Sequence, residues 1–92
     1  MEVKFSKSSI KFLNKLPPKN KEQIRTKILF LVNFIENEGF VPIRELDIKK
    51  LKGNWQVFFR MRIGKIRIIF TIGENQNELS IYEIDFRGDI YK

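Results

Sequence analysis

Apolar and polar residues alternate along two adjacent stretches of the C-terminal half, and this alternation predicts a β-hairpin. Gly64-Lys65 separates the stretches, and glycine at the first position of a two-residue loop favours a type II′ turn. This turn sets the predicted cross-strand pairs Ile63–Ile66, Arg62–Arg67, Met61–Ile68, Phe59–Phe70 and Val57–Ile72. One face is then wholly apolar, and the other carries Arg60, Arg62 and Arg67. Two arginines directly opposite each other are unfavourable by roughly 0.2–1 kcal/mol, so the arrangement indicates a polyanion-binding site.

The N-terminal half has the spacing of two amphipathic helices that follow a short strand at Glu2 to Phe5. Ser6 is expected to cap the first helix. The second is predicted to run from Pro18 to about Asn37, because proline is favoured in a first turn and Gly39 suits a helix end. Its buried stripe is predicted to comprise Ile24, Ile28, Leu31 and Ile35. Residues 39–53 lack a strong period, so we predict a loop with room for a short helical turn.

Three strands are predicted after this loop, at about 55–63, 66–72 and 79–86. In the last strand the apolar positions change sides after Ile81, so either it is buried on both sides or a bulge near Glu83 reverses its facing. The order β-α-α-β-β-β predicts an α+β fold, an antiparallel sheet with two N-terminal helices packed on one face. We expect residues 1–92 to form a single domain that leaves the arginine face open to solvent.

Composition narrows the chemistry that this face can support. The chain has no cysteine and no histidine, which excludes disulfides, thiolate metal sites and catalytic Ser-His or Cys-His pairs. We therefore expect no metal and no other cofactor. The N-terminus lacks a signal-peptide pattern, and no apolar run approaches the roughly 20 residues that span a bilayer. A cytoplasmic protein without membrane contact is expected.

Eighteen Lys and Arg against eleven Asp and Glu give a net charge of +7. Residues 1–53 contribute +6 (12 basic and 6 acidic side chains), and residues 54–92 contribute +1 (6 and 5). This excess favours a nucleic acid, an acidic protein or an anionic surface as partner. A solvated basic surface explains the net charge equally well.

Carboxylates, an aromatic ring and a tyrosine accompany the arginines. Glu83, Asp85 and Asp89 are interleaved with basic positions, so we interpret them as partners that orient arginines or face solvent rather than as a metal site. Phe58 shares the arginine face and either stacks on a nucleobase or covers its own sheet. Arginines can stabilise the phosphorane oxygens that form when an RNA 2′-hydroxyl attacks phosphorus. Tyr91 is the only candidate general base near them.

Three segments resemble the RelE-like toxins of the RelE/ParE superfamily of type II toxin–antitoxin systems. They are Leu51-Lys52-Gly53, the run from Phe59 to Phe70, and Phe86-Arg87-Gly88-Asp89-Ile90-Tyr91; Phe5 to Pro17 is similar to the family's first helix. The resemblance implies the fold above and a metal-independent endoribonuclease that cuts messenger RNA in the ribosomal A site and so inhibits translation. Attack by the 2′-hydroxyl would leave a 2′,3′-cyclic phosphate. It also implies a heteromeric complex with a small acidic antitoxin, bound by helix packing or strand addition.

The resemblance assigns roles to individual residues. The family's basic pair falls on Arg60 and Arg62, its phosphate-stabilising arginine on Arg67, its last-strand arginine on Arg87 and its terminal tyrosine on Tyr91. We therefore expect Arg62, Arg67, Arg87 and Tyr91 to be catalytic, and Lys50, Lys52 and Arg60 to contact RNA or the ribosome. Two departures from the family pattern weaken any mechanism in which side chains at these positions transfer a proton. RelE itself has lysines at the paired positions, and Phe86 stands where relatives often have histidine.

Two alternatives stay open on the sequence. A ParE-like toxin that targets gyrase shares the fold but needs no nuclease activity. A non-catalytic RNA-binding or protein-binding module of the same fold would keep the basic face without the chemistry. The presence of all five family positions favours the nuclease.

Overall fold

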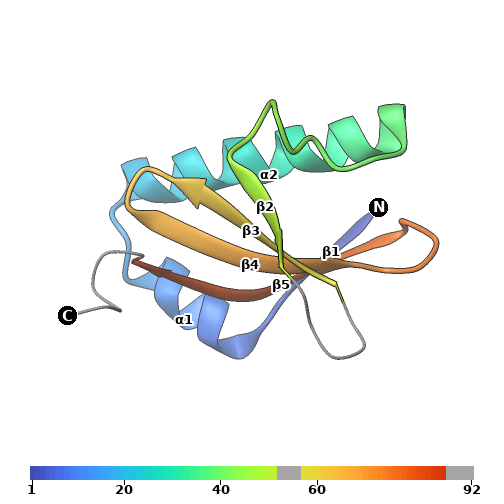
Figure 1. The fold of residues 1–92 in the computed structure, drawn as a ribbon. Helices are drawn as coiled ribbons and strands as arrows, with labels where there is room; N and C mark the ends of the chain where they lie inside the picture. The colour runs from blue at the N-terminus through green and yellow to red at the C-terminus, as the bar shows by residue number, and fades with distance from the viewer. Residues whose placement is uncertain (52–56, 87–92) are drawn as a thin grey trace.

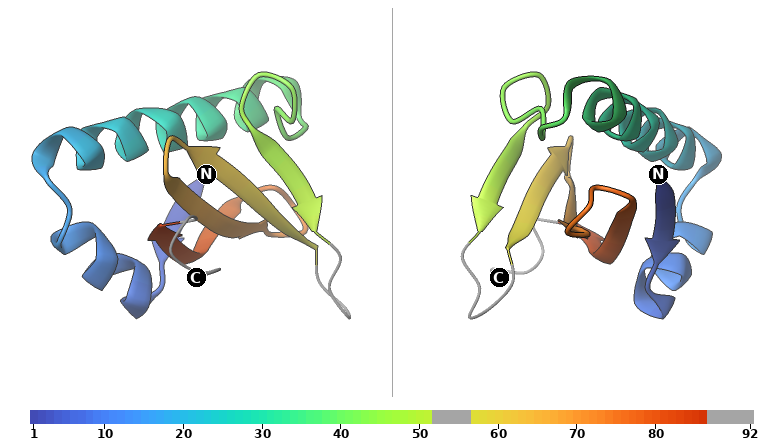
Figure 2. Two further views of the ribbon diagram at one scale, coloured as in Figure 1. Left: turned by 60° about the vertical axis from the view of Figure 1, so that its left-hand side comes forward. Right: turned by 90° about the vertical axis from the view of Figure 1, so that its right-hand side faces the viewer.

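The structure, a computed structural model, describes residues 1–51 and 57–86, and these ranges contain two helices and five strands (Figure 1). In chain order they are β1 (Glu2–Phe5), α1 (Lys7–Asn14), α2 (Pro18–Glu38), β2 (Ile48–Leu51), β3 (Phe58–Ile63), β4 (Ile66–Ile72) and β5 (Glu78–Phe86). The strands form one sheet in the order β1-β5-β4-β3-β2, so β1 and β2 are its edges (Figure 2). The predicted α+β class is confirmed.

The β3–β4 hairpin has the predicted register. Gly64 has φ +58° and is the only residue of the two-residue loop with a positive φ, as a type II′ turn requires. Arg62 is paired with Arg67. The hairpin is shorter than predicted at its open end, because β3 begins at Phe58 and Val57 is 43% exposed. The predicted pair of Val57 with Ile72 is therefore not part of the ladder.

Helix α2 provides most of the helical contribution to the core. It begins at Pro18 and ends where Gly39, at φ +80°, donates its N–H to the carbonyl of Ile35 at 2.8 Å. The predicted stripe is buried, and it comprises Ile24, Ile28, Leu31 and Ile35. Within the described ranges, no helix combines the length and apolar character needed to cross a membrane.

Helix α1 packs near β5. Ser6 caps it, as predicted, because its Oγ accepts a hydrogen bond from the Ser9 N–H at 3.2 Å. Phe12 makes an edge-to-face contact with Phe86, with ring centroids 5.1 Å apart, and Phe86 is opposite Ile66 on the apolar face. Both helices therefore cover the same face of the sheet, as predicted.

The two edge strands differ from the prediction. β1 is parallel to β5, so the sheet is mixed rather than antiparallel. Parallel neighbours need a long connection, and nearly the whole chain lies between these two strands. β2 forms within the segment predicted as a loop. Lys49 and Lys50 obscure the apolar alternation on which the prediction depended, although lysines suit an exposed edge strand.

A β-bulge in β5 decides between the two interpretations of that strand. Ile69 of β4 is paired with Glu83, but the next residue, Phe70, is paired with Ile81, so Tyr82 is the extra residue. The bulge brings Ile81 and Ile84 to the same side, where they are 1% and 4% exposed. The bulge alternative is therefore confirmed.

Candidate nucleic-acid interface

The face of the sheet opposite the helices, here called the open face, carries the predicted arginines in two rows across the strands. Residues directly opposite each other on neighbouring strands project from the same face. The Arg67 row comprises Arg62, Arg67 and Asp85, and the Arg60 row comprises Arg60, Ile69 and Glu83. Arg62 and Arg67 thus lie side by side, as a shared phosphate site requires.

Asp85 holds Arg67 in a bidentate ion pair. Nε of Arg67 donates to Oδ1 of Asp85 at 3.1 Å, and Nη2 donates to Oδ2 at 2.9 Å. The two side chains are only 18% and 22% exposed. Because two parallel hydrogen bonds fix the plane of a guanidinium, Arg67 is oriented before any ligand arrives.

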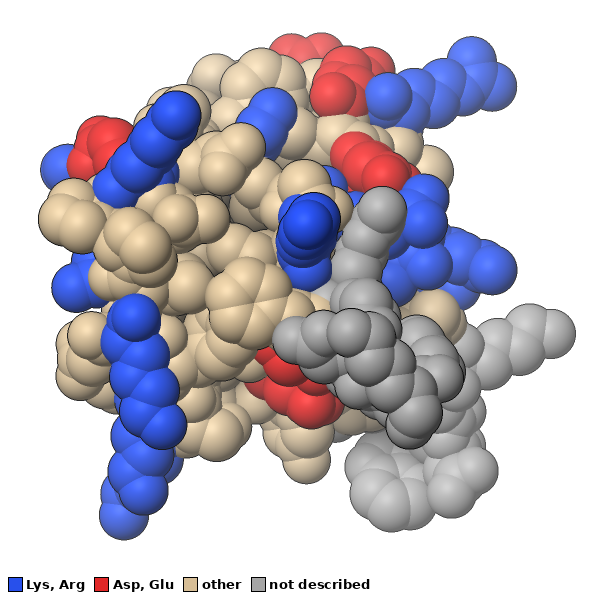
Figure 3. Space-filling view, turned by 90° about the vertical axis from the view of Figure 1, so that its left-hand side faces the viewer, with Lys and Arg blue, Asp and Glu red and all other residues tan. Residues whose placement is uncertain are grey.

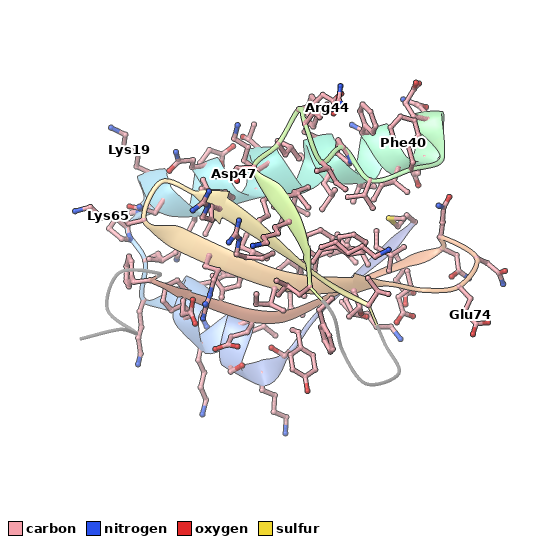
Figure 4. All side chains as sticks on the ribbon, viewed as in Figure 1. Lys19, Phe40, Arg44, Asp47, Lys65 and Glu74 are labelled. Atoms are coloured by element: carbon pink, nitrogen blue, oxygen red, sulfur yellow. The ribbon has the colours of Figure 1, made fainter. Side chains whose placement is uncertain are left out.

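Asp47 forms a bidentate ion pair with Arg62, as Asp85 does with Arg67. Nε of Arg62 donates to Oδ2 at 2.9 Å and Nη2 donates to Oδ1 at 3.2 Å. Nη2 of Arg60 lies 3.9 Å from the same Oδ1, so Asp47 contacts both arginines of β3. Figure 4 shows Asp47 immediately before β2. The repulsion expected between Arg62 and Arg67 is therefore offset, because each arginine has its own carboxylate.

Glu83 lies two residues before Asp85 on the open face. A hydrogen bond with Asp85 is the main cause that raises the pKa of Glu83, burial and the Asp85 charge add to it, and Arg67 opposes it. In the part of the chain that the structure describes, no group of three or more potential ligands is arranged to hold a metal ion. These contacts agree with the interpretation of Asp85 as a partner that orients an arginine.

An aromatic pair borders the arginine rows. Tyr82 is 61% exposed, and its ring meets Phe58 edge-to-face with the centroids 5.4 Å apart. The sequence left the facing of Tyr82 undetermined, because alternation alone does not place a bulge. Asp47 was also missed, since it lies just before a strand that was predicted as loop. For neither residue did the sequence contain a specific signal.

Lys50, which was predicted to contact RNA or the ribosome, projects from the opposite face of the sheet. Lys50 is opposite Phe59, so it lies on the helix-covered side, whereas Lys49 is opposite Arg60 and joins the open face. Lys50 and Arg60 are therefore not brought together on one face, and the predicted contact of Lys50 with RNA or the ribosome stays a prediction.

Three predicted site residues, Lys52, Arg87 and Tyr91, lie outside the described residues, so their roles stay predictions. Basic side chains are also spread widely over the part of the surface drawn in Figure 3, with acidic side chains between them. Net charge therefore does not single out the open face. What distinguishes the open face is the pairing of Arg62 with Arg67 across two strands.

No family model matches this chain. A protein of Methanocaldococcus jannaschii called "Toxin RelE3" is 34% identical over 91 residues, which cover 99% of this chain and 96% of the relative. "Putative toxin RelE1" of the same organism is 32% identical over 90 residues, covering 98% and 93%. A crystal structure of the archaeal RelE–RelB complex from Pyrococcus horikoshii has a chain with TM-score 0.71 and 27% identity, with 96% of both chains covered. The chain therefore belongs to the RelE toxin family.

Proposed function

We propose that this chain is the toxin of a type II toxin–antitoxin system and inhibits translation by cutting messenger RNA on the ribosome. The observation that carries the proposal is the Arg67 row, in which two arginines from neighbouring strands lie side by side on a face that the helices leave open. Membership of the RelE toxin family supports the toxin role. We further propose that residues 1–92 act as one domain.

The proposed reaction is a transesterification within the RNA. The ribose 2′-oxygen attacks phosphorus, the bond from phosphorus to the 5′-oxygen breaks, and a 2′,3′-cyclic phosphate and a 5′-hydroxyl result. Arg62, Arg67 and Arg87 stabilise the charge that develops on the phosphorane oxygens. Tyr91 in its phenolate form accepts the proton of the 2′-hydroxyl and becomes the neutral phenol, and water supplies a proton to the departing 5′-oxygen. No metal takes part.

Asp47 and Asp85 are suited to act as temporary partners of the arginines until RNA binds. A phosphate presents two oxygens to a guanidinium much as a carboxylate does, so RNA can replace Asp47 or Asp85 without a change in the arginine's orientation. Arg60 is held less firmly by Asp47 than Arg62 is. Its Nη2 lies 3.9 Å from Oδ1 of Asp47, whereas Nε of Arg62 lies 2.9 Å from Oδ2, so a phosphate that binds Arg60 competes with the weaker contact.

An apolar groove beside the sheet edge is suited to the antitoxin. It encloses about 320 Å³ and is lined by Val3, Phe5, Leu13, Ile24, Ile28 and Leu29, together with the exposed basic residues Lys21 and Arg25. A mostly apolar lining with two exposed basic residues complements an acidic amphipathic segment, and the adjacent edge strand β1 offers backbone groups for strand addition. The structurally similar Pyrococcus chain was crystallised as a RelE–RelB complex, which supports a cognate antitoxin here.

The test is expression of the chain in growing cells, with the 5′ ends of transcripts mapped during arrest. We expect growth arrest with cuts confined to translated regions, and relief by the antitoxin encoded beside the gene. Arg67→Ala should reduce the cuts by about 100-fold or more. Arg44→Ala, which removes an exposed arginine from the loop before β2 (Figure 4), should leave them unchanged. Arrest with intact transcripts and gyrase-dependent DNA damage would instead identify a ParE-like toxin.

A further inference from the structure

The aromatic pair at the margin of the arginine rows has the properties of a ligand platform. Tyr82 is 61% exposed even though it lies within a strand that has a neighbour on each side. Its ring meets Phe58 at an interplanar angle of 66°, and Phe58 itself is half-buried. Tyr82 therefore contributes little to the core and presents most of its surface to solvent.

The fold holds Tyr82 in place at the bulge. Its backbone carbonyl accepts a hydrogen bond from Ser6 Oγ at 2.8 Å, and the Ser6 N–H donates to the carbonyl of Ile81 at 3.0 Å. The residue that caps α1 thus also anchors the bulge. Thr71, which shares the open face, is only 6% exposed, so this end of the face is closely packed. The backbone at Tyr82 is therefore fixed and its ring contacts Phe58, so ligand binding orders only the ring itself.

The pair lies at the right separation from the arginines. Phe58 and Arg60 are alternate residues of β3, so they project from the same face about 7 Å apart along the strand. Tyr82 directly precedes Glu83 of the Arg60 row. A phosphate on the arginines would therefore leave its neighbouring base within reach of the aromatic rings.

We propose that Phe58 and Tyr82 form a stacking platform for one nucleobase of the RNA strand whose phosphate the arginine rows hold. The proposal rests on the proposed RNA-cleaving function. Aromatic rings accept any base, because every base has a π-face, so the platform would add affinity and position without strong sequence preference. Phe40 provides a contrast, since it is 56% exposed but packs against Phe34 of α2 (Figure 4).

The test uses a short single-stranded RNA with one 2-aminopurine and a 2′-O-methyl group on every ribose, which prevents cleavage. Stacking on an aromatic ring quenches 2-aminopurine fluorescence. We expect quenching by the wild-type protein, a roughly 10-fold or greater loss of affinity in Tyr82→Leu and Phe58→Leu, and retention in Tyr82→Phe. Phe40→Leu, the matched control, should bind like the wild type.

Two further readouts separate stacking from a structural role. The salt dependence of affinity counts phosphate contacts, so its slope should be unchanged in Tyr82→Leu and shallower by about 0.7 in Arg60→Ala. An RNA with an abasic site in place of the 2-aminopurine, its affinity measured by competition, should bind wild type and Tyr82→Leu equally. Equal affinity of both proteins for the intact RNA would overturn the platform and leave the nuclease proposal standing. Tyr82-dependent stacking without cleavage on ribosomes would overturn the nuclease alone.

Discussion

Loss of the Asp85 carboxylate should destabilise the fold far more than loss of the Asp47 carboxylate. The two ion pairs have nearly the same geometry, with hydrogen bonds of 2.9 and 3.1 Å in one and 2.9 and 3.2 Å in the other. Their burial differs. The Arg67–Asp85 side chains are 18% and 22% exposed, and the Arg62–Asp47 side chains are 39% and 50% exposed. Hydrogen bonds to charged groups contribute about 1.5–3 kcal/mol when shielded, whereas exposed ion pairs contribute about 0.2–1 kcal/mol.

We therefore expect Asp85→Ala to lower the free energy of unfolding by about 2 kcal/mol and Asp47→Ala by about 0.5 kcal/mol. In a domain of this size, about 2 kcal/mol corresponds to a fall of roughly 8–16 °C in Tm. Thermal unfolding of the wild type and both variants, followed by circular dichroism, measures the difference. High salt should reduce the effect of Asp47→Ala but not that of Asp85→Ala, because salt screens exposed charges more strongly. Equal losses in the two variants would refute the argument from burial.

Three other predictions concern the bulge, the turn and the groove. The folded-state pKa of Glu83 is raised, so the stability that its bound proton provides is present below about pH 4.5 and is lost as the pH rises through the raised pKa. The Tm of Glu83→Gln minus that of the wild type should therefore become more positive between pH 4 and 7. A difference that stays constant over this range would contradict the prediction. Gly64→Ala should lower stability by about 1 kcal/mol in urea unfolding, because φ is +58° although a Cβ would meet no atom within 4 Å. Gly73→Ala should lose less, because Gly73 has no positive φ and its Cβ would meet only the end of the flexible Asn77 side chain closely, at 3.3 Å. Leu29→Glu should weaken antitoxin binding at least about 10-fold in calorimetry while leaving Tm nearly unchanged, since Leu29 is 50% exposed.

Local patterns predicted the parts of the fold that depend on local physics. The Gly64-Lys65 turn fixed the register of its own hairpin, and the apolar stripe from Ile24 to Ile35 placed α2 against the sheet. The parallel pairing of β1 with β5 depends on contacts between distant segments, which no local pattern encodes. β2 was missed because half of its residues are lysines.

The site was predicted in part for the same reason. Arg62 and Arg67 follow directly from the turn, so their pairing was available from the sequence. Their two carboxylate partners could not be predicted equally well from the sequence. Asp85 was recognised as a possible partner because it lies within a predicted strand, but Asp47 depends on β2. Tyr82 depends on where the bulge falls, and both facings satisfied the alternation.

The most direct test of the account is the rate at which purified protein cuts messenger RNA on programmed ribosomes. The central claim is that arginines paired across β3 and β4 stabilise the breaking phosphodiester. Loss of one transition-state donor typically lowers the rate 100-fold to 1,000-fold, so Arg67→Ala should cut at least about 100-fold more slowly than wild type at a temperature where both are folded. Arg44→Ala should cut at the wild-type rate. Wild-type cutting by Arg67→Ala would contradict the account.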